Sequence, residues 1–229
     1  MIELQGVTKR YHGKKALDSV DLTLEPGKIV GLVGENGSGK STTLKLIAGL
    51  NHPTRGRVTV NGHKATRRIA DRVAYLSELD DYYPFFTVGG MIDFHASQFP
   101  DFDTKKADEM LSFMNLERSS KVKTLSKGNR GRLKIVLTLS RNVPVLLMDE
   151  PLSGLDPMVR DSIVKSLISF IDIENQIVLI TTHEIKEIEG ILDDVIAIKD
   201  GHIIGHHNVE DLRFEHGKGI VEWMTEVYQ

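Results

Sequence analysis

Residues 34 to 41 of this chain read G-E-N-G-S-G-K-S, and this segment constrains the fold more than any other. An apolar run from Ile29 to Val33 precedes it, and apolar residues at helical spacing follow between Ser41 and Leu50. A strand, a glycine-rich turn and a helix start, in that order, are the context of a phosphate-binding loop. We therefore expect a buried strand, a loop that wraps phosphate groups, and a helix that begins near Ser41.

The residue types in this loop suit a nucleoside triphosphate, which carries several negative charges. Glycine allows the backbone to take positive φ angles and to turn its N–H groups inward, and the helix start adds a partial positive charge. Lys40 can reach the β- and γ-phosphates, and the Ser41 hydroxyl can bind Mg²⁺. The expected nucleotide ligands here are Gly34, Asn36, Gly37, Ser38, Gly39, Lys40, Ser41 and Thr42. The alternative is a glycine-rich turn that binds nothing.

Composition narrows the class of protein. The chain has 229 residues, a net charge of −3 and no cysteine. The charge argues against a dedicated nucleic-acid binder, and the missing thiols exclude disulfides and thiolate metal sites and fit a reducing compartment. No signal peptide is visible, and every apolar run is far shorter than the ~20 residues that span a bilayer. We expect a soluble protein that reaches any membrane through a partner.

Hydrophobic periodicity predicts alternating strands and helices. Alternation from Val20 to Leu24 indicates a half-buried antiparallel strand, which Ile2 to Val7 can pair. Apolar runs predict strands at 58–62, 73–76, 145–148 and 177–180, and the Asp200-Gly201 turn predicts a hairpin of 195–198 with 202–204. Helical spacing dominates 87–141 and returns at 163–171, 185–191 and 220–227. This order indicates an α/β fold with a largely parallel sheet.

The same pattern predicts one domain over residues 1–229. We expect a P-loop NTPase core, formed by 1–76 and 143–229 and including an N-terminal antiparallel β region. A helical subdomain is expected as an insertion at 77–142.

Two carboxylates, Asp149 and Glu150, follow the apolar strand that ends at Met148. In a nucleotide-binding α/β sheet the carboxyl ends of the strands face the ligand. Asp149 could therefore hold Mg²⁺, and Glu150 could polarise the attacking water as a general base. A pair of solvated acids is the common alternative for an isolated Asp-Glu, but the loop at residue 34 weakens it.

Further motifs occur in a fixed order around these acids. They are Leu125-Ser126-Lys127-Gly128-Asn129 before the acids, and Ser153-Gly154-Leu155-Asp156 and then His183 after them. With the glycine-rich loop, this ordered set resembles the ATP-binding subunit of an ABC transporter. The resemblance covers essentially the whole chain, from Ile2 to about Leu212.

The resemblance implies roles for the matching residues. Tyr11 matches the aromatic residue that stacks on adenine, although it could be an ordinary tyrosine at a strand end. Ser126 and Gly128 match the signature motif, which binds the γ-phosphate of ATP held by the opposite subunit. Asp156 matches the loop that crosses the dimer interface, and it can also cap the helix that Pro157 begins. His183 matches the histidine that senses the γ-phosphate, which makes it catalytic with Lys40 and Glu150.

Two departures from the family pattern stand out. In the signature, Lys127 and Asn129 replace a glycine-type and a glutamine-type residue, and the charge of Lys127 lies near either the nucleotide or a membrane partner. Where the family has a glutamine that touches Mg²⁺, this chain has Ser77-Glu78. Glu78 can still offer an oxygen to Mg²⁺, but its charge beside the γ-phosphate is expected to slow hydrolysis or to alter metal preference.

Two other clusters each allow two interpretations. Residues 80–86, D-D-Y-Y-P-F-F, concentrate aromatic side chains where the resemblance implies a groove for a short helix of the membrane subunit. Aromatic residues are common interface anchors, but the same residues could pack the helical subdomain. His202, His206 and His207 lack acidic or thiol ligands at a diagnostic spacing, so we expect solvated histidines and no metal site.

The resemblance implies an ATPase that uses ATP and Mg²⁺ to power transport across a membrane. The expected partners are a transmembrane permease and a second ATPase subunit, identical or different, and no nucleic acid. The expected location is cytoplasmic and peripheral on the inner face of the cell membrane, in the export-type branch. The alternatives are a soluble ATPase that acts on ribosomes or DNA, and a regulatory module that does not hydrolyse ATP.

Overall fold

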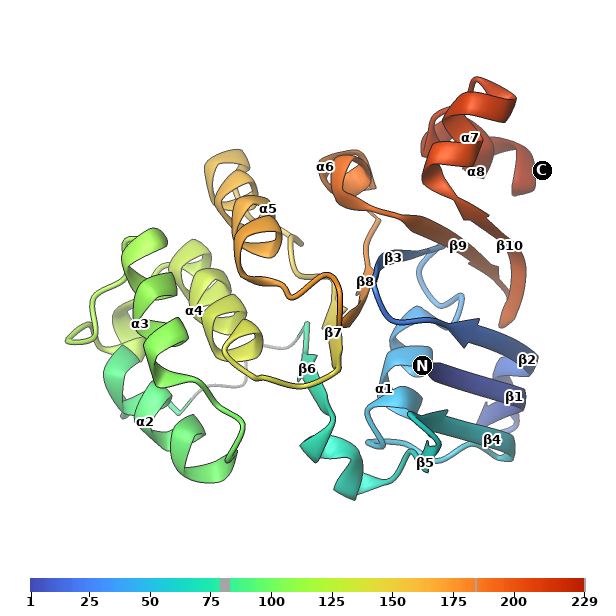
Figure 1. Ribbon diagram of the computed structural model, residues 1–229. Helices are drawn as coiled ribbons and strands as arrows, with labels where there is room; N and C mark the ends of the chain where they lie inside the picture. The colour runs from blue at the N-terminus through green and yellow to red at the C-terminus, as the bar shows by residue number, and fades with distance from the viewer. Residues whose placement is uncertain (79–82, 184, 229) are drawn as a thin grey trace.

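The computed structural model describes residues 1–78, 83–183 and 185–228. Figure 1 shows a helical region on one side of a central sheet and a second, antiparallel sheet on the other side. The expected α/β architecture with an N-terminal antiparallel part and an inserted group of helices is therefore confirmed.

The central sheet contains six strands in the order β10-β9-β3-β8-β7-β6. Neighbouring strands from β9 to β6 run parallel, and β10 joins β9 as an antiparallel edge strand. The bounds are β3 (Lys28–Val33), β6 (Val73–Leu76), β7 (Val145–Asp149), β8 (Ile177–Thr181), β9 (Asp194–Lys199) and β10 (His202–Asn208). The strands β7 and β8 are buried along their whole length, as expected for parallel strands covered on both faces.

The expected hairpin near the C-terminus is also present. Asp200 and Gly201 both have positive φ, at 48° and 79°, and they connect β9 to β10. Two central residues with positive φ give the turn that matches the twist of an antiparallel pair.

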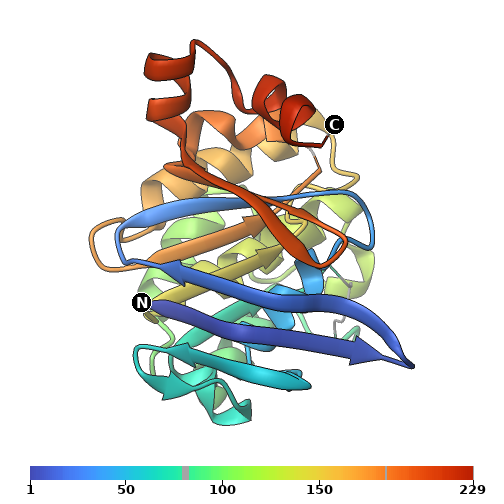
Figure 2. The ribbon, with the colours of Figure 1, turned by 90° about the vertical axis from the view of Figure 1, so that its right-hand side faces the viewer.

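The N-terminal sheet has the order β2-β1-β4-β5 and is antiparallel throughout. Its strands are β1 (Ile2–Tyr11), β2 (Lys14–Leu24), β4 (Arg55–Val60) and β5 (His63–Lys64), and β1, β2 and β4 form the layer nearest the viewer in Figure 2. In register, Ile2 faces Leu24 and Leu4 faces Leu22. These four side chains are buried, so the alternation seen in the sequence marks the inner face.

Helix α1 (Lys40–Ile47) packs in the core shared by the two sheets. Val30 and Leu32 of β3 belong to that core, whereas Ile29 and Val33 belong to the core on the opposite face. This division follows from the period of two in a strand. The helix ends at Ile47 and not near Leu50 as expected, because Gly49 takes a φ of 67° and breaks the pattern.

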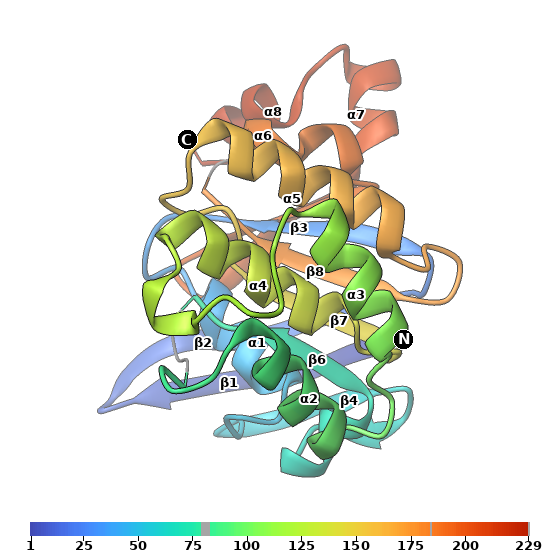
Figure 3. The ribbon, with the colours of Figure 1, turned by 90° about the vertical axis from the view of Figure 1, so that its left-hand side faces the viewer.

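The inserted helices are α2 (Val88–Gln98), α3 (Thr104–Phe113) and α4 (Lys127–Leu139). Each begins at a side-chain cap: Thr87, Asp103 and Ser126 accept hydrogen bonds from backbone N–H groups of the first turn. Figure 3 shows α4 and α5 (Pro157–Phe170) lying across one face of the central strands.

The C-terminal part contains the short α6 (Ile185–Ile188), then α7 (Val209–His216) and α8 (Ile220–Val227). The periodicity predicted α8 but not α7. It also assigned Ile168 and Ile171 to the helical pattern at 163–171; in the structure Ile171 caps the end of α5, and the side chain of Ile168 is 53% exposed. No helix among the described residues has the length and apolar character needed to cross a bilayer.

Candidate active site

The loop that follows β3 has the backbone that a phosphate-binding loop requires. Gly37 and Gly39 take φ angles of 85° and 118°, which side chains rarely allow. A Cβ at Gly34 would lie 2.4 Å from the carbonyl oxygen of Ile198, so no larger residue fits there without backbone movement. The Ser38 hydroxyl oxygen is buried and has no hydrogen-bond partner within the described part of the chain, which suits an anionic ligand.

Lys40 lies at the start of α1 and is almost entirely buried. Its Nζ donates hydrogen bonds to the carbonyl oxygens of Gly34 at 2.7 Å and Glu35 at 3.2 Å, and lies 4.0 Å from Oε1 of Glu150. Burial lowers the pKa of Lys40, and the neighbouring acids, Glu150 first, oppose that shift. The acids therefore help to retain the positive charge at the loop.

Asp149 connects the loop to the carboxyl end of β7. Its Oδ1 accepts hydrogen bonds from the hydroxyls of Ser41 at 2.9 Å and Thr181 at 2.8 Å, and its Oδ2 accepts one from Tyr75 at 3.0 Å. Burial and the charge of Asp149 raise the pKa of Tyr75, so the phenol remains a donor. The hydroxyl and the carboxylate are hard oxygen donors of the kind that Mg²⁺ prefers, so Ser41 and Asp149 fit this ion.

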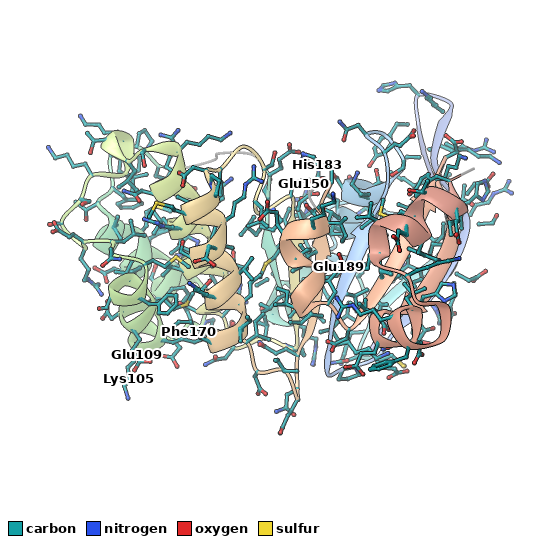
Figure 4. All side chains as sticks on the ribbon, turned by 90° about the horizontal axis from the view of Figure 1, so that it is seen from above. Lys105, Glu109, Glu150, Phe170, His183 and Glu189 are labelled. Atoms are coloured by element: carbon teal, nitrogen blue, oxygen red, sulfur yellow. The ribbon has the colours of Figure 1, made fainter. Side chains whose placement is uncertain are left out.

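Glu150 and His183 contact each other at the site. Oε2 of Glu150 lies 2.8 Å from Nδ1 of His183 and 3.3 Å from its backbone nitrogen. The Glu150 backbone has a φ of 50°, and its N–H donates to Thr181 at both the carbonyl oxygen (3.1 Å) and the hydroxyl (3.0 Å). Thr181 therefore holds the backbone of Glu150, and His183 holds its carboxylate. Figure 4 shows Glu150 and His183 next to each other beside α6. A carboxylate held in this way can orient a water molecule.

Lys40, Glu150 and His183 line one cavity of about 300 Å³, whereas Asp149 is outside its lining. Its lining combines the loop, the acids and the histidine: Ala16, Asn36, Gly37, Gly39, Lys40, Ser41, Thr42, Glu78, Glu150, Ser153 and His183. The structure thus brings Glu78 to the same cavity as Lys40 and Ser41, although Glu78 is far from that pair in sequence.

Lys127 is placed beside the acids of this site. Glu78 and Glu150 also line an adjacent hollow of about 140 Å³ together with Lys127 and Lys134. The ammonium of Lys127 lies over Gly154, where an added Cβ would be 2.2 Å from its Nζ. Of the two positions left open by the sequence, the structure therefore favours the side of the nucleotide loop.

The signature and interface residues lie elsewhere in this single chain. The Ser126 hydroxyl accepts a hydrogen bond from the N–H of Asn129 at 3.2 Å, and Asp156 accepts one from Val159 at 3.0 Å. A Cβ at Gly128 would lie 2.9 Å from a methyl group of Val159 and 3.7 Å from Oδ2 of Asp156. These residues form a group of their own, outside the lining of the loop cavity, and their role toward the ATP of a second subunit stays a prediction.

Tyr11 is also outside the lining of the loop cavity. Its hydroxyl accepts a hydrogen bond from the side chain of Asn51 at 2.7 Å, and Nζ of Lys9 lies 4.8 Å from the centre of its ring. The side chain is partly exposed. Its contact with adenine stays a prediction.

The aromatic segment is divided between buried and exposed side chains, and its contact with a membrane subunit stays a prediction. Asp80, Asp81 and Tyr82 lie outside the described residues. Phe86 packs against the core of the helical region, whereas Phe85 is 76% exposed at 4.6 Å from it, measured between ring centroids. Phe86 therefore helps to pack the helical region, whereas Phe85 lies on the surface.

The C-terminal histidines have protein contacts. Nε2 of His206 lies 3.2 Å from Oδ2 of Asp194, and the ring of His207 lies 5.4 Å from that of Trp223, edge to face.

Sequence reasoning missed several residues that position the acids. Tyr75 and Thr181 hold Asp149, and Nζ of Lys134 donates to the carbonyl oxygens of Ser77 at 3.2 Å and Glu78 at 3.1 Å. Thr181 had a usable signal, because it ends a parallel strand next to β7 and so lies at the same edge of the sheet as Asp149. The others depend on tertiary contacts.

Known proteins share this sequence pattern and fold. A family model described as ABC transporter matches residues 17–153. The ABC transporter ATP-binding protein YtrB of Bacillus subtilis (strain 168) is 27% identical over 229 residues, which cover 99% of this chain and 78% of the relative. The Nod factor export ATP-binding protein I of Ralstonia nicotianae is 31% identical over 233 aligned positions, gaps included. The match covers 97% of this chain and 72% of the relative.

Solved structures give the same result. An ATP-binding subunit of an ABC transporter is similar with a TM-score of 0.86 and 25% identity, over 100% of both chains. A dimeric ATP-binding cassette in a post-hydrolysis state, bound to ADP and Pi, has a TM-score of 0.81 and 26% identity, over 91% of this chain and 98% of that chain.

Proposed function

Because this chain belongs to the ABC transporter family as an ATP-binding subunit, we propose that the cavity over residues 34–42 is the place where it binds and hydrolyses ATP. The observation that carries this proposal is the convergence of Lys40, Ser41, Glu150 and His183 on one cavity. These residues come from three separate segments of the chain, at 40–41, 150 and 183, and a structural core has no need to bring them together beside a glycine-rich loop.

Each of these residues has a definite task in the proposed reaction. Lys40 and the inward N–H groups of the loop bind the phosphates of ATP and oppose their charge. Glu150 accepts a proton from water as the water attacks the γ-phosphate, and ADP leaves. His183, which lies 2.8 Å from Glu150, keeps that carboxylate in place and reaches toward the γ-phosphate. Mg²⁺, when bound by Ser41 and Asp149, supplies positive charge for the phosphate oxygens.

Glu78 is proposed as the oxygen donor that replaces the family's glutamine. Its carboxylate adds a negative charge to a site that must accept a polyphosphate. Lys127 and Lys134 line the hollow next to it, so their charges reduce this repulsion. We therefore expect ATP binding to persist despite the substitution.

The proposed partners are a second ATP-binding subunit and a membrane-spanning permease. In a dimer, Ser126, Gly128 and Asp156 of one subunit would meet the ATP of the other. The exposed Phe85 is proposed to anchor the permease, because exposed aromatic side chains are typical of interface centres. The chain would then work at the inner face of the membrane, and export is the proposed direction because one of its relatives is named for Nod factor export.

ATPase activity of the purified chain tests the proposal. Inorganic phosphate is measured with ATP and Mg²⁺ for the wild type, Lys40→Ala and Glu109→Gln, a surface control on α3. Phosphate release by the wild type and the control, but not by Lys40→Ala, is the expected result. Equal rates for all three proteins would remove the loop from the site.

Purification of the chain from its own cells tests the partners. A multi-span membrane protein in the purified sample would support the permease, and ribosomes would favour the soluble class of ATPase that acts on ribosomes.

A further inference from the structure

The C-terminal helix α8 ends directly against the start of the phosphate-binding loop. The hydroxyl of Tyr228, the residue after α8, lies 2.9 Å from the carbonyl oxygen of Ile198 and 3.2 Å from that of Val33. Tyr228 and Val33 are 195 residues apart in sequence. Val33 is the last residue of β3, so the next residue is Gly34. A Cβ at Gly34 would lie 3.0 Å from the Tyr228 oxygen, which shows how closely the phenol covers this turn.

The opposite end of α8 is attached near the histidine. The backbone N–H of Ile220 donates to Oε1 of Glu189 at 3.0 Å, and Glu189 follows α6, the helix that begins two residues after His183. In Figure 4, His183 and Glu189 lie at α6, next to the C-terminal helices. One helix of eight residues therefore connects the segment after the histidine with the segment before the loop.

The orientation of α8 is set by tight packing on the edge strand β10. Ile220 and Trp223 are buried, and a Cβ at Gly205 would lie 2.6 Å from the indole ring of Trp223. A further anchor is Lys199, whose Nζ donates to the carbonyl oxygen of Tyr228 at 2.8 Å. These contacts fix α8 on the sheet. Movement of the loop at Gly34 would therefore act on this helix through the Tyr228 contact.

A cavity of about 570 Å³ separates the middle of α8 from the loop. Its walls include Gly34 and Glu35 from the loop, His183 and Ile185 from the histidine segment, and Met224 and Tyr228 from the C-terminal segment. Because this space lies between the helix and the loop, their contact is concentrated at the Tyr228 hydroxyl.

We propose that Tyr228 is a positioning residue for the phosphate-binding loop, and that α8 couples this loop to the segment that carries His183. The inference rests on the proposed nucleotide binding at residues 34–42. The Tyr228 hydroxyl stabilises the carbonyl groups at the ends of β3 and β9, so the loop leaves the sheet in the conformation that receives phosphates. Nucleotide binding in turn changes the contact between the loop and Tyr228, and through it the packing of α8.

Tyr228→Phe tests the first part, because it removes only the hydroxyl and retains the ring. We expect the KM for ATP to rise about two- to tenfold, the range for one neutral hydrogen bond, with kcat within about twofold of the wild type. A merely structural role would lower the fraction of active protein, and so lower kcat without changing KM. Glu226→Gln is the matched control, since Glu226 lies on the same helix and pairs with Lys218 at the surface. Its KM should equal that of the wild type.

Trp223 reports on the second part without any substitution. It is the only tryptophan of the chain, and it lies on α8. We expect its emission to change when ADP or ATP is added to the wild type and to Glu226→Gln, and to change less in Tyr228→Phe. This measurement remains informative if Tyr228→Phe fails to fold.

The outcomes separate the two proposals. A wild type that does not bind radiolabelled ATP overturns the proposed function and this inference with it. A wild type that binds ATP while its Trp223 emission stays constant overturns the coupling. A folded Tyr228→Phe protein with an unchanged KM overturns the positioning role, and in both of these cases the proposed function stands.

Discussion

Replacement of Glu150 by glutamine is the most informative single change in this protein. The carboxylate accepts a hydrogen bond from the backbone of His183, lies 2.8 Å from the imidazole Nδ1, and lies 4.0 Å from Nζ of Lys40. Glutamine has the same shape and can retain the contacts with His183. The substitution therefore removes the charge and the base but leaves the local structure intact.

Two effects of opposite direction follow from these contacts. Loss of a general base slows hydrolysis by about 10²–10⁴-fold. At the same time, Lys40 loses an attraction that competes with the phosphates. Two unit charges 4.0 Å apart attract by about 4 kcal/mol at an effective dielectric of about 20. If a third of that attraction opposes ATP in the wild type, ATP binds about tenfold more tightly to the variant.

The assay combines phosphate release, ATP affinity and size-exclusion chromatography with ATP and Mg²⁺. Glu150→Gln should hold ATP, release almost no phosphate, and elute as a dimer, because the proposed dimer would stay closed while its ATP remains intact. Glu109→Gln is the matched control: Glu109 lies on α3, on the far side of the molecule in Figure 4, with Lys105 as its salt-bridge partner. A Glu150→Gln protein that hydrolyses ATP normally and stays monomeric would refute the assignment of the base.

Three further changes test other parts of the site and the fold. Lys40→Ala removes a charged hydrogen-bond donor and should weaken ATP binding by about ten- to a hundredfold, measured by calorimetry; unchanged affinity would contradict its contact with the phosphates. Glu78→Gln should raise ATP affinity or basal hydrolysis and weaken any preference for Mn²⁺ over Mg²⁺, whereas identical rates in both metals would show that Glu78 does not act at the metal. Arg141→Ala leaves Asp101 without its buried partner, 3.0 Å away, and should lower the free energy of unfolding in urea by about 3–5 kcal/mol. A double variant that also carries Asp101→Ala should recover part of that loss, and no recovery would mean that the ion pair is not the cause.

The parts of the fold that were predictable are those in which local chemistry decides the structure. A strand, a glycine-rich turn and a helix start are encoded within residues 29 to 50, because hydrophobic period, positive φ and helix initiation all act over a few residues. The same holds for the turn at Asp200 and Gly201 and for the acids that follow β7. The family resemblance rests on these local motifs in their order along the chain.

Local patterns were less reliable where packing decides the outcome. Ile168 follows helical spacing but is 53% exposed, since the spacing alone does not say which face of α5 meets the core. Helix α7 was not predicted, although its start at Asn208 has a regular side-chain cap. Its short length and its mixed polarity leave little periodic signal.

Only the tertiary structure decided how the site is held together. The Tyr75 hydroxyl meets Asp149 across 74 residues of sequence, and the Tyr228 hydroxyl meets Val33 across 195. The shared hollow of Glu78 and Lys127 is equally invisible in the sequence, because opposite charges far apart in a chain carry no signal of contact. A motif specifies which groups are present through local backbone preferences, whereas their mutual distances arise from the packing of strands and helices that are distant in sequence.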